Sequence, residues 1–179
     1  MSSKILPTPM NVLFHIAAGT AIIANSSKEE TLSSKDQLTK TFTGFTLGVI
    51  SHGILDYSPH CYPVNSKVDV IVSLIIIIAL ILLSQKVWKF IVGGTLFGCI
   101  FPDLVDLSPG LINSLFGMHL PTFPPVFPWH FPEYSGSIYS GDCDVSFVNH
   151  LLTLFVCGGM VWLNRKIFVK IFKRINIHS

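Results

Sequence analysis

Five apolar stretches, each about as long as a membrane-spanning helix, constrain this chain more than any other feature of its sequence. They cover about 9–25, 41–57, 68–84, 88–107 and 145–163. A helix needs roughly 17–25 mostly apolar residues to cross the hydrocarbon layer of a bilayer. The third stretch, with the run VIVSLIIIIALILL, is the least ambiguous. The second is short and mildly polar, which predicts that the other helices surround it.

The composition supports a membrane protein. Only 12% of the 179 residues are charged, 50% are hydrophobic, and the mean hydropathy is +0.59. A soluble domain has about 25% charged residues. The length indicates one domain covering 1–179. We therefore predict an all-α fold, a polytopic membrane bundle of about five transmembrane helices, and no nucleic-acid partner.

The segments between the stretches differ in kind. Residues 26–40 are polar and charged, which predicts a solvated loop, and 164–179 form a basic tail. Residues 108–144 carry six prolines and many aromatic residues. Proline disfavours regular helix, and aromatic residues favour the membrane surface, so we expect an irregular cap there. The pairs Gly44/Gly48 and Gly94/Gly98 have the G-x-x-x-G spacing of closely packed helices, although such pairs also occur incidentally.

Basic residues predict the orientation. With five spans, ten Lys and Arg residues fall on the side of the tail and two on the other side. The positive-inside rule then places the C-terminus in the cytoplasm and the N-terminus outside. The 108–144 segment has no Lys or Arg, as expected of an outer loop. Lys4 and the apolar run after it also resemble a signal peptide cleaved near Asn25, but His15 inside that run favours a span.

Six ionisable residues lie within or beside the apolar stretches, and this orientation puts all of them in the outer half. They are His15, His52, Asp56, Asp103, Asp106 and His150. An ionisable group at the bilayer centre costs on the order of 3 kcal/mol, so such groups are rare and usually functional. All six are metal-ligand types. Their convergence at one side predicts a metal site.

The spacing of these residues suggests their roles. His52 and Asp56 form H-x-x-x-D, which places both side chains on one helix face, where they can hold one ion. A buried His–Asp hydrogen bond is the alternative. Asp103 and Asp106 are three residues apart, so one can ligate while the other orients a ligating histidine. A solvated helix end would explain this pair equally simply.

From this pattern we predict the metal ligands His15, His52, Asp56, Asp103 and His150. We assign proton handling to Asp106 or His130. His130 could instead complete the metal shell, or serve only as an interface anchor beside Trp129. His15 could equally be a satisfied core histidine, and His150 an interfacial one. His60 and His119 are explained as loop residues near the membrane surface.

Four cysteines are present, and none forms a C-x-x-C pair, so a thiolate zinc site is not expected. Cys99 and Cys157 lie in apolar stretches and are expected to be core residues. Cys61 and Cys143 fall outside the membrane, where they could pair or remain free thiols.

The pieces SHGILDYSPH, GCIFPDLVDLSP and VNHLLTLF resemble the inner-membrane metal-dependent hydrolases, the group that includes a LexA-regulated bacterial member. That family tends to show an early membrane histidine, an SH-x-x-x-D element, a PD-x-D element and a THSLL-like element. His15, His52/Asp56, Asp103/Asp106 and His150 occupy these places, with PD-x-x-D in place of PD-x-D and Asn149 where the family has threonine. The resemblance implies hydrolase activity and a location in a bacterial inner membrane.

The leading hypothesis is therefore an integral membrane, metal-dependent hydrolase. Zn²⁺ is the expected ion, because it lowers the pKa of its water towards about 7, and Mn²⁺ or Fe²⁺ would also suit a shell with carboxylates. A site under an aromatic cap suits a lipid or phosphoester substrate. The rivals are a non-catalytic metal-binding protein or metal or proton transporter, and a structural subunit whose polar groups pair with a partner.

Overall fold

The computed structural model describes residues 12–26, 32–61, 66–138 and 144–172. This part of the chain is helical, and it contains no β-strand beyond an isolated bridge between His60 and Ser137. The predicted all-α class is thus confirmed. The elements are α1 Val12–Asn25, α2 Ser34–Tyr57, α3 Ser66–Leu83, η1 Lys86–Trp88, α4 Lys89–Asp106, α5 Ser108–Phe116, η2 Pro128–His130, α6 Asp144–Leu163 and α7 Arg165–Phe172.

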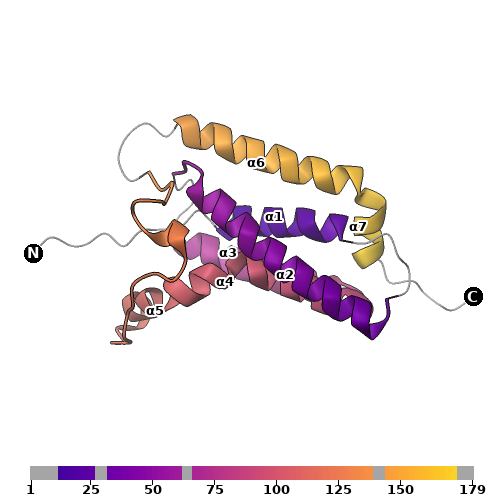
Figure 1. Ribbon diagram of the computed structural model, residues 1–179, viewed down its shortest axis with the longest axis horizontal. Coiled ribbons are helices and arrows are strands. Elements are labelled where there is room, and N and C mark those ends of the chain that lie inside the picture. Colours follow the sequence, from indigo (N-terminus) through magenta and orange to yellow (C-terminus); the bar gives the residue numbers. More distant parts are fainter. Residues whose placement is uncertain (1–11, 27–31, 62–65, 139–143, 173–179) are drawn as a thin grey trace, which may run out of the picture.

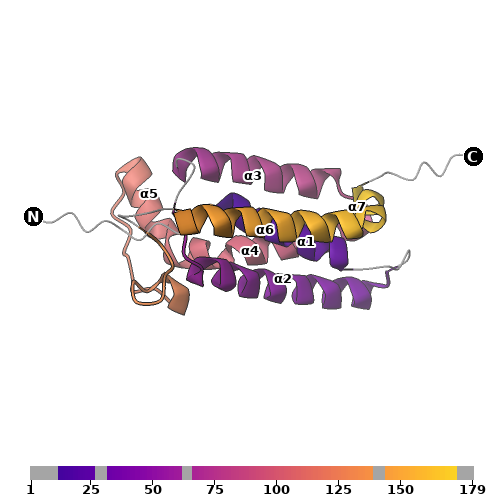
Figure 2. The same ribbon diagram turned by 90° about the horizontal axis from the view of Figure 1, so that it is seen from above.

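Five long helices lie side by side, and α1 runs through the middle of them (Figures 1 and 2). α1 contacts α2, α3, α4 and α6 along its length, and α7 at its end. The buried core joins Ile16 and Ile23 of α1 to Ile91 and Leu96 of α4. The central helix is also tied at its start: Asp69 of α3 accepts hydrogen bonds from the backbone N–H groups of Val12, at 2.7 Å, and Leu13, at 3.2 Å.

α2 and α4 approach so closely that glycine is required at their contact. A Cβ atom built on Gly98 would lie 2.2 Å from the Phe45 carbonyl oxygen, and one on Gly48 would lie 2.7 Å from the Thr95 carbonyl oxygen. Gly44 and Gly94 are equally crowded, against Thr95 and Thr41. The close packing predicted from both G-x-x-x-G pairs is confirmed.

Three helical segments depart from the predicted boundaries. The 26–40 linker is not all loop, because α2 begins at Ser34, where Ser33 and Asp36 form a capping box. The 108–144 segment is not irregular throughout, because it contains α5. Pro109 sits in the first turn of α5, where proline is tolerated, and Gly117, with φ 64°, ends the helix. The tail contains α7, and its last residues, 173–179, lie outside the described ranges.

Among the described helices, two are long and apolar enough to cross a membrane by length and composition, Lys86–Asp106 and Asp144–Leu163. Two shorter apolar helices, Val12–Asn25 and Val68–Leu83, lie beside them. Little of α6 is covered by the rest of the protein. In its apolar stretch 11% of the residues are buried, against 44% in the segment that contains α4. The predicted start of the first stretch, 9–11, lies outside the described residues.

Candidate metal centre

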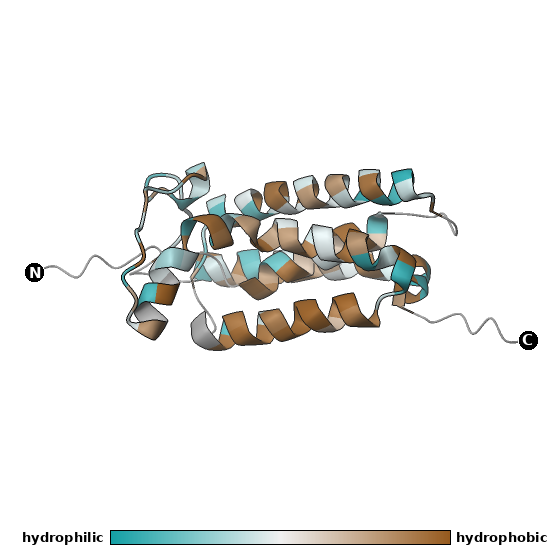
Figure 3. Cartoon of the chain, turned by 90° about the horizontal axis from the view of Figure 1, so that it is seen from below, coloured by the Kyte–Doolittle hydropathy of each residue, from teal (hydrophilic) through white to brown (hydrophobic). Residues whose placement is uncertain are grey.

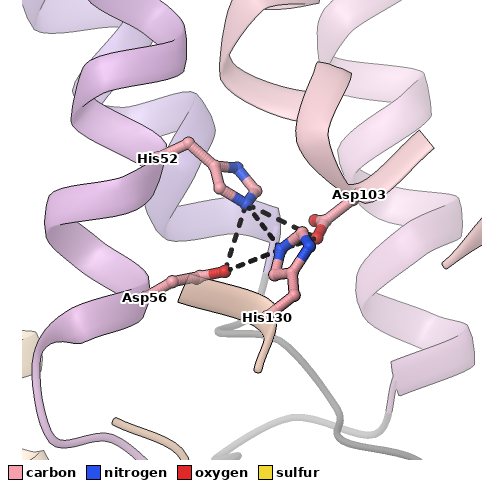
Figure 4. Close-up of side chains that lie close together, drawn as sticks. All are labelled: His52, Asp56, Asp103 and His130. Carbon is pink, nitrogen blue, oxygen red and sulfur yellow. Dashed lines mark hydrogen bonds and ion pairs between the residues drawn. The ribbon is translucent and has the colours of Figure 1, made fainter. Parts of the chain in front are cut away.

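Four side chains from three segments meet at one end of the bundle. His52 and Asp56 come from α2, Asp103 from α4 and His130 from η2, and each offers one ligand atom within 4.8 Å of the others (Figure 4). Gly44, Gly48, His52 and Asp56 are spaced four residues apart along one face of α2. The glycines that bring α2 against α4 therefore also aim the two ligand-type side chains at Asp103.

The distances between the donor atoms fit a single small ion. His52 Nε2 lies 3.1 Å from Asp56 Oδ2 and 3.5 Å from Asp103 Oδ1. His130 Nε2 lies 3.2 Å and 3.4 Å from the same two oxygens, and 3.4 Å from His52 Nε2. Four ligands placed tetrahedrally about 2.0–2.1 Å from zinc are separated by roughly 3.3 Å. These five separations lie within 0.2 Å of that value.

Both histidines point Nε2 at the carboxylates. His52 Nδ1 donates to the Cys99 carbonyl oxygen at 2.7 Å, and His130 Nδ1 donates to Asp106 Oδ2 at 2.7 Å. In the neutral rings this leaves a lone pair on each Nε2. A lone pair and a carboxylate at this distance repel, so the space between them needs either a proton on Nε2 or a cation, and a metal ion would meet that need.

The carboxylates are buried without the hydrogen bonds they require. Asp56 is 1% exposed, and within the described residues neither its two oxygens nor those of Asp103 accept a hydrogen bond. Buried carboxylates are normally paired or bound to metals, because an unpaired buried charge is costly. The donor set, the orphaned oxygens and the spacing therefore all fit a divalent cation.

Asp106 takes the orienting role that the sequence allowed for one of the two aspartates. Its carboxylate accepts the His130 Nδ1–H and the backbone N–H groups of Val126, at 2.8 Å, and Phe127, at 3.0 Å. A carboxylate behind a ligating histidine fixes its tautomer and ring direction. Burial lowers the pKa of His130, but the nearby carboxylates, led by Asp103 and Asp56, outweigh burial and raise this pKa to about 9.

His15 and His150, also predicted as ligands, lie outside the four-residue group. His15 is fully buried, stacks on the His52 ring with centroids 4.0 Å apart, and places Nε2 3.3 Å from Asp56 Oδ1. His150 stacks instead on Phe14 at 4.2 Å, and its Nδ1 lies 3.4 Å from the Ser146 hydroxyl. His15 therefore contacts the centre, whereas His150 packs beside α1.

Sequence reasoning missed the contacts that seat the cap on α2. A Cβ atom on Gly53 would lie 2.7 Å from Cε3 of Trp129, so the indole occupies the space that a side chain would fill. His130 follows Trp129 in the sequence, so this contact also positions the fourth donor of the group. No periodic signal in the sequence of α2 marks Gly53, because the residue that requires a glycine there, Trp129, lies in a distant segment.

A second anchor involves His60, which the sequence suggested was only a loop residue. The His60 backbone exchanges hydrogen bonds with Gly136 and Ile138, at 2.9 Å and 2.8 Å, and the Gly136 N–H donates to the Asp56 carbonyl oxygen at 2.8 Å. The side chain donates from Nδ1 to the Ser58 carbonyl oxygen at 2.7 Å. Burial lowers the pKa of His60. The residue fastens the 135–138 segment to the end of α2.

The cysteines fall into two classes. Cys99 and Cys157 are free and lie in helices; Cys99 is buried, as expected of a core residue, whereas Cys157 is only half-buried. Cys61 is disulfide-bonded, and Cys143, the partner considered from the sequence, lies outside the described residues. Cys61 also donates its backbone N–H to the Ser146 hydroxyl, at 2.6 Å. This hydrogen bond links the chain just after α2 to the first turn of α6.

Comparisons of the chain with protein-family models, with curated proteins and with solved structures find no match.

Proposed function

We propose that this protein is a membrane-embedded, metal-dependent hydrolase that acts on a lipid or phosphoester at the outer membrane face. The observation that carries the proposal is the buried group of His52, Asp56, Asp103 and His130, whose donor atoms are spaced for one divalent ion. The resemblance to the inner-membrane hydrolases rests on its short motifs and remains a prediction, as does the location in a bacterial inner membrane.

The apolar outer surface supports placement in a membrane. Large apolar side chains are exposed along the helices, including Phe155 at 80%, Leu163 at 78% and Leu82 at 64%. α3, at the lower edge of Figure 3, is apolar along its length. Contiguous exposed apolar surface on this scale would promote aggregation in water, and it suits contact with lipid chains.

The charge distribution supports the orientation. Lys86, Lys89, Arg165 and Lys170 belong to η1, α4 and α7, at the end of the bundle away from η2 and α5 (Figure 1). The positive-inside rule puts that end in the cytoplasm and the four donors at the outer face. Cysteines introduced at Lys35 and at Ser135 should then react with an impermeant thiol reagent from opposite sides. Labelling of both from one side would refute the orientation.

The protein's own residues would bind the ion, orient its ligands and limit the access of water. Asp106 holds His130 in place, and the Cys99 carbonyl holds His52. The Asp103 side chain is 14% exposed, whereas those of His52, Asp56 and His130 are at most 4% exposed, so a substrate would approach from the Asp103 side. A bound divalent ion would supply Lewis acidity and a water that ionises near neutral pH.

One observation favours a non-catalytic metal-binding protein as the second candidate. Catalytic zinc keeps an open position, whereas four protein ligands at tetrahedral spacing fill its shell. A six-coordinate ion such as Mn²⁺ or Fe²⁺ would keep positions for water and substrate in the same group. Transport fits less well, because the inner half of the described core buries apolar residues such as Ile23 and Ile91, beside hydroxyl groups such as that of Ser84.

Metal analysis combined with hydrolysis assays tests these candidates. The purified protein should bind a divalent ion that is lost in Asp103→Asn, and a panel of phospholipids and phosphomonoesters should be hydrolysed by the wild type only. Assays should be run after loading with Zn²⁺, Mn²⁺ and Fe²⁺ separately. Stoichiometric metal without hydrolysis under any loading would support the non-catalytic candidate, and absence of metal binding would refute both.

A further inference from the structure

A shallow apolar groove runs between α1 and α6, away from the metal centre. Its volume is about 370 Å³. The lining comes from one face of α1, one face of α6 and the first residue of α7: Ala17, Thr20, Leu154, Cys157, Gly158, Val161, Trp162 and Arg165. From Leu154 to Trp162 the helical rise is about 12 Å. The Thr20 hydroxyl donates to the Ile16 carbonyl oxygen at 2.8 Å, so its hydrogen needs no partner from a molecule in the groove.

The glycine in this groove differs from those between α2 and α4. A Cβ atom built on Gly158 would meet nothing within 4 Å, and the same holds for Gly159. Glycine inside a helix costs about 1 kcal/mol relative to alanine, which closer packing of neighbouring elements can offset. No described part of this chain uses the space above Gly158, so the glycine leaves a hollow open at the surface.

One end of the groove carries a fixed positive charge. The Arg165 guanidinium lies 4.8 Å from the centroid of the Trp162 ring and donates from Nη1 to the Trp162 carbonyl oxygen at 3.1 Å. A guanidinium has five N–H donors, and that bond uses one of them. Arginine recognises phosphate through paired hydrogen bonds. An apolar channel that ends at such a group matches a molecule with an apolar chain and an anionic head.

We propose that this groove binds an anionic phospholipid, with an acyl chain over Gly158 and the phosphate at Arg165. The proposal rests on the membrane placement argued above and is independent of metal binding and hydrolysis. A second copy of the chain is a poorer occupant, because two copies paired through this face in one membrane would bring their Arg165 charges together. The bulky Val161 and Trp162 also wall the channel, whereas close helix pairing favours small residues.

Native mass spectrometry of the detergent-purified protein tests the proposal, with phosphatidylglycerol and phosphatidylcholine added separately. We expect one phosphatidylglycerol retained per chain, at least about tenfold more strongly than phosphatidylcholine, since the difference lies in net charge at Arg165. Arg165→Gln should remove this preference, and Gly158→Leu should reduce retention of both lipids by filling the hollow. A thiol reagent should react with Cys157 more slowly when phosphatidylglycerol is bound.

Matched controls separate the groove from the general charge and shape of the helix. Lys166→Gln removes the adjacent basic charge, and Gly159→Leu makes the same substitution at a glycine outside the groove lining; both should retain the lipid as the wild type does. Melting temperatures of all variants establish that they are folded. Equal retention of the two lipids by the wild type, unchanged retention in both groove variants, or a dimer that Gly158→Leu dissociates would each overturn the proposal.

Discussion

Glycines serve opposite purposes in the two helix pairs of this bundle. Between α2 and α4, added Cβ atoms on Gly48 and Gly98 would collide with backbone atoms of the opposite helix. Between α1 and α6, an added Cβ on Gly158 would meet nothing within 4 Å. The first pair uses missing side chains to bring two backbones together, and the second leaves a groove. The same residue in an apolar helix can thus indicate packing or a vacant surface, depending on its neighbour.

The difference also explains where the polar residues lie. Close approach of α2 and α4 brings His52 and Asp56 within reach of Asp103, and the cap adds His130. α6 contributes no donor to this group, and His150 contacts α1 through Phe14 instead. A buried charged centre needs the rigid, closely packed interface, because loose packing would leave its carboxylates without fixed partners.

The largest expected effect comes from Gly98→Leu. Its side chain would overlap the Phe45 backbone, which cannot move aside without separating α2 from α4. We expect a loss of about 3 kcal/mol or more in the free energy of unfolding, together with loss of metal binding. The matched variant Gly159→Leu, which points into open space, should leave stability unchanged or raise it by up to about 1 kcal/mol through helix propensity. Similar melting temperatures for the two variants would contradict the proposed difference between the crowded glycine at the α2–α4 contact and the uncrowded glycine of α6.

Next in size is Asp56→Asn, which keeps the shape of the α2–α4 interface but removes a charge. If Asp56 is a ligand, metal affinity should fall by more than the ~10–100-fold typical of an outer partner. The metal-free protein could gain stability, because an unpaired buried carboxylate is costly. Metal content and melting temperature should be measured on one preparation. Undiminished metal in a folded variant would exclude Asp56 from the shell.

Asp106→Asn should have a smaller effect, about 10–100-fold in metal affinity, because the residue acts on the ion only through His130. Its carboxylate also holds Val126 and Phe127, so part of the loss should come from a looser cap. Isothermal titration with the metal alone measures the change. An effect as large as that of Asp56→Asn would mean that Asp106 itself binds the ion.

The pH dependence should be the mildest effect over one pH unit. In the metal-free protein the pKa of His130 is about 9, so at pH 7 its ring is charged and must lose a proton before Nε2 can bind an ion. Apparent metal affinity should therefore rise by at least about tenfold per pH unit up to roughly pH 9. Competition with a chelator of known pH behaviour measures this. A flat profile between pH 7 and 8 would exclude proton release from His130.

The sequence predicted the helices better than their connections. The apolar stretches marked five helices, and the paired glycines marked two sites of close packing, because both signals are local. The start of α2 was missed because the capping box at Ser33 and Asp36 lies in a polar segment that resembles a loop. The α5 helix was missed because proline was treated as a breaker everywhere, although Pro109 lies in the first turn.

The site was predictable where ligand spacing follows helical geometry. His52 and Asp56 share a helix face, and Asp103 precedes Asp106 by one turn. The sequence favoured His130 over His119 but left its role open between proton handling, a metal ligand and an interface anchor beside Trp129. What distinguishes His130 is a set of non-local contacts: Asp106 binds its ring and the backbone before it, while Trp129 packs on Gly53. Such contacts leave no periodic trace in the chain.

The carboxylate of Asp69 ties the start of α1 to a helix that is made later. α1 leaves the ribosome before α3, yet the side chain that receives the N–H groups of Val12 and Leu13 belongs to α3, 57 residues after Val12. If the bundle spans a membrane, as we propose, these donors need water until α3 inserts, because unpaired backbone donors are costly in lipid. The start of α1 would then stay at the hydrated surface until its neighbour arrives. A nascent chain halted before Asp69 should hold α1 in a shallow, reversible position.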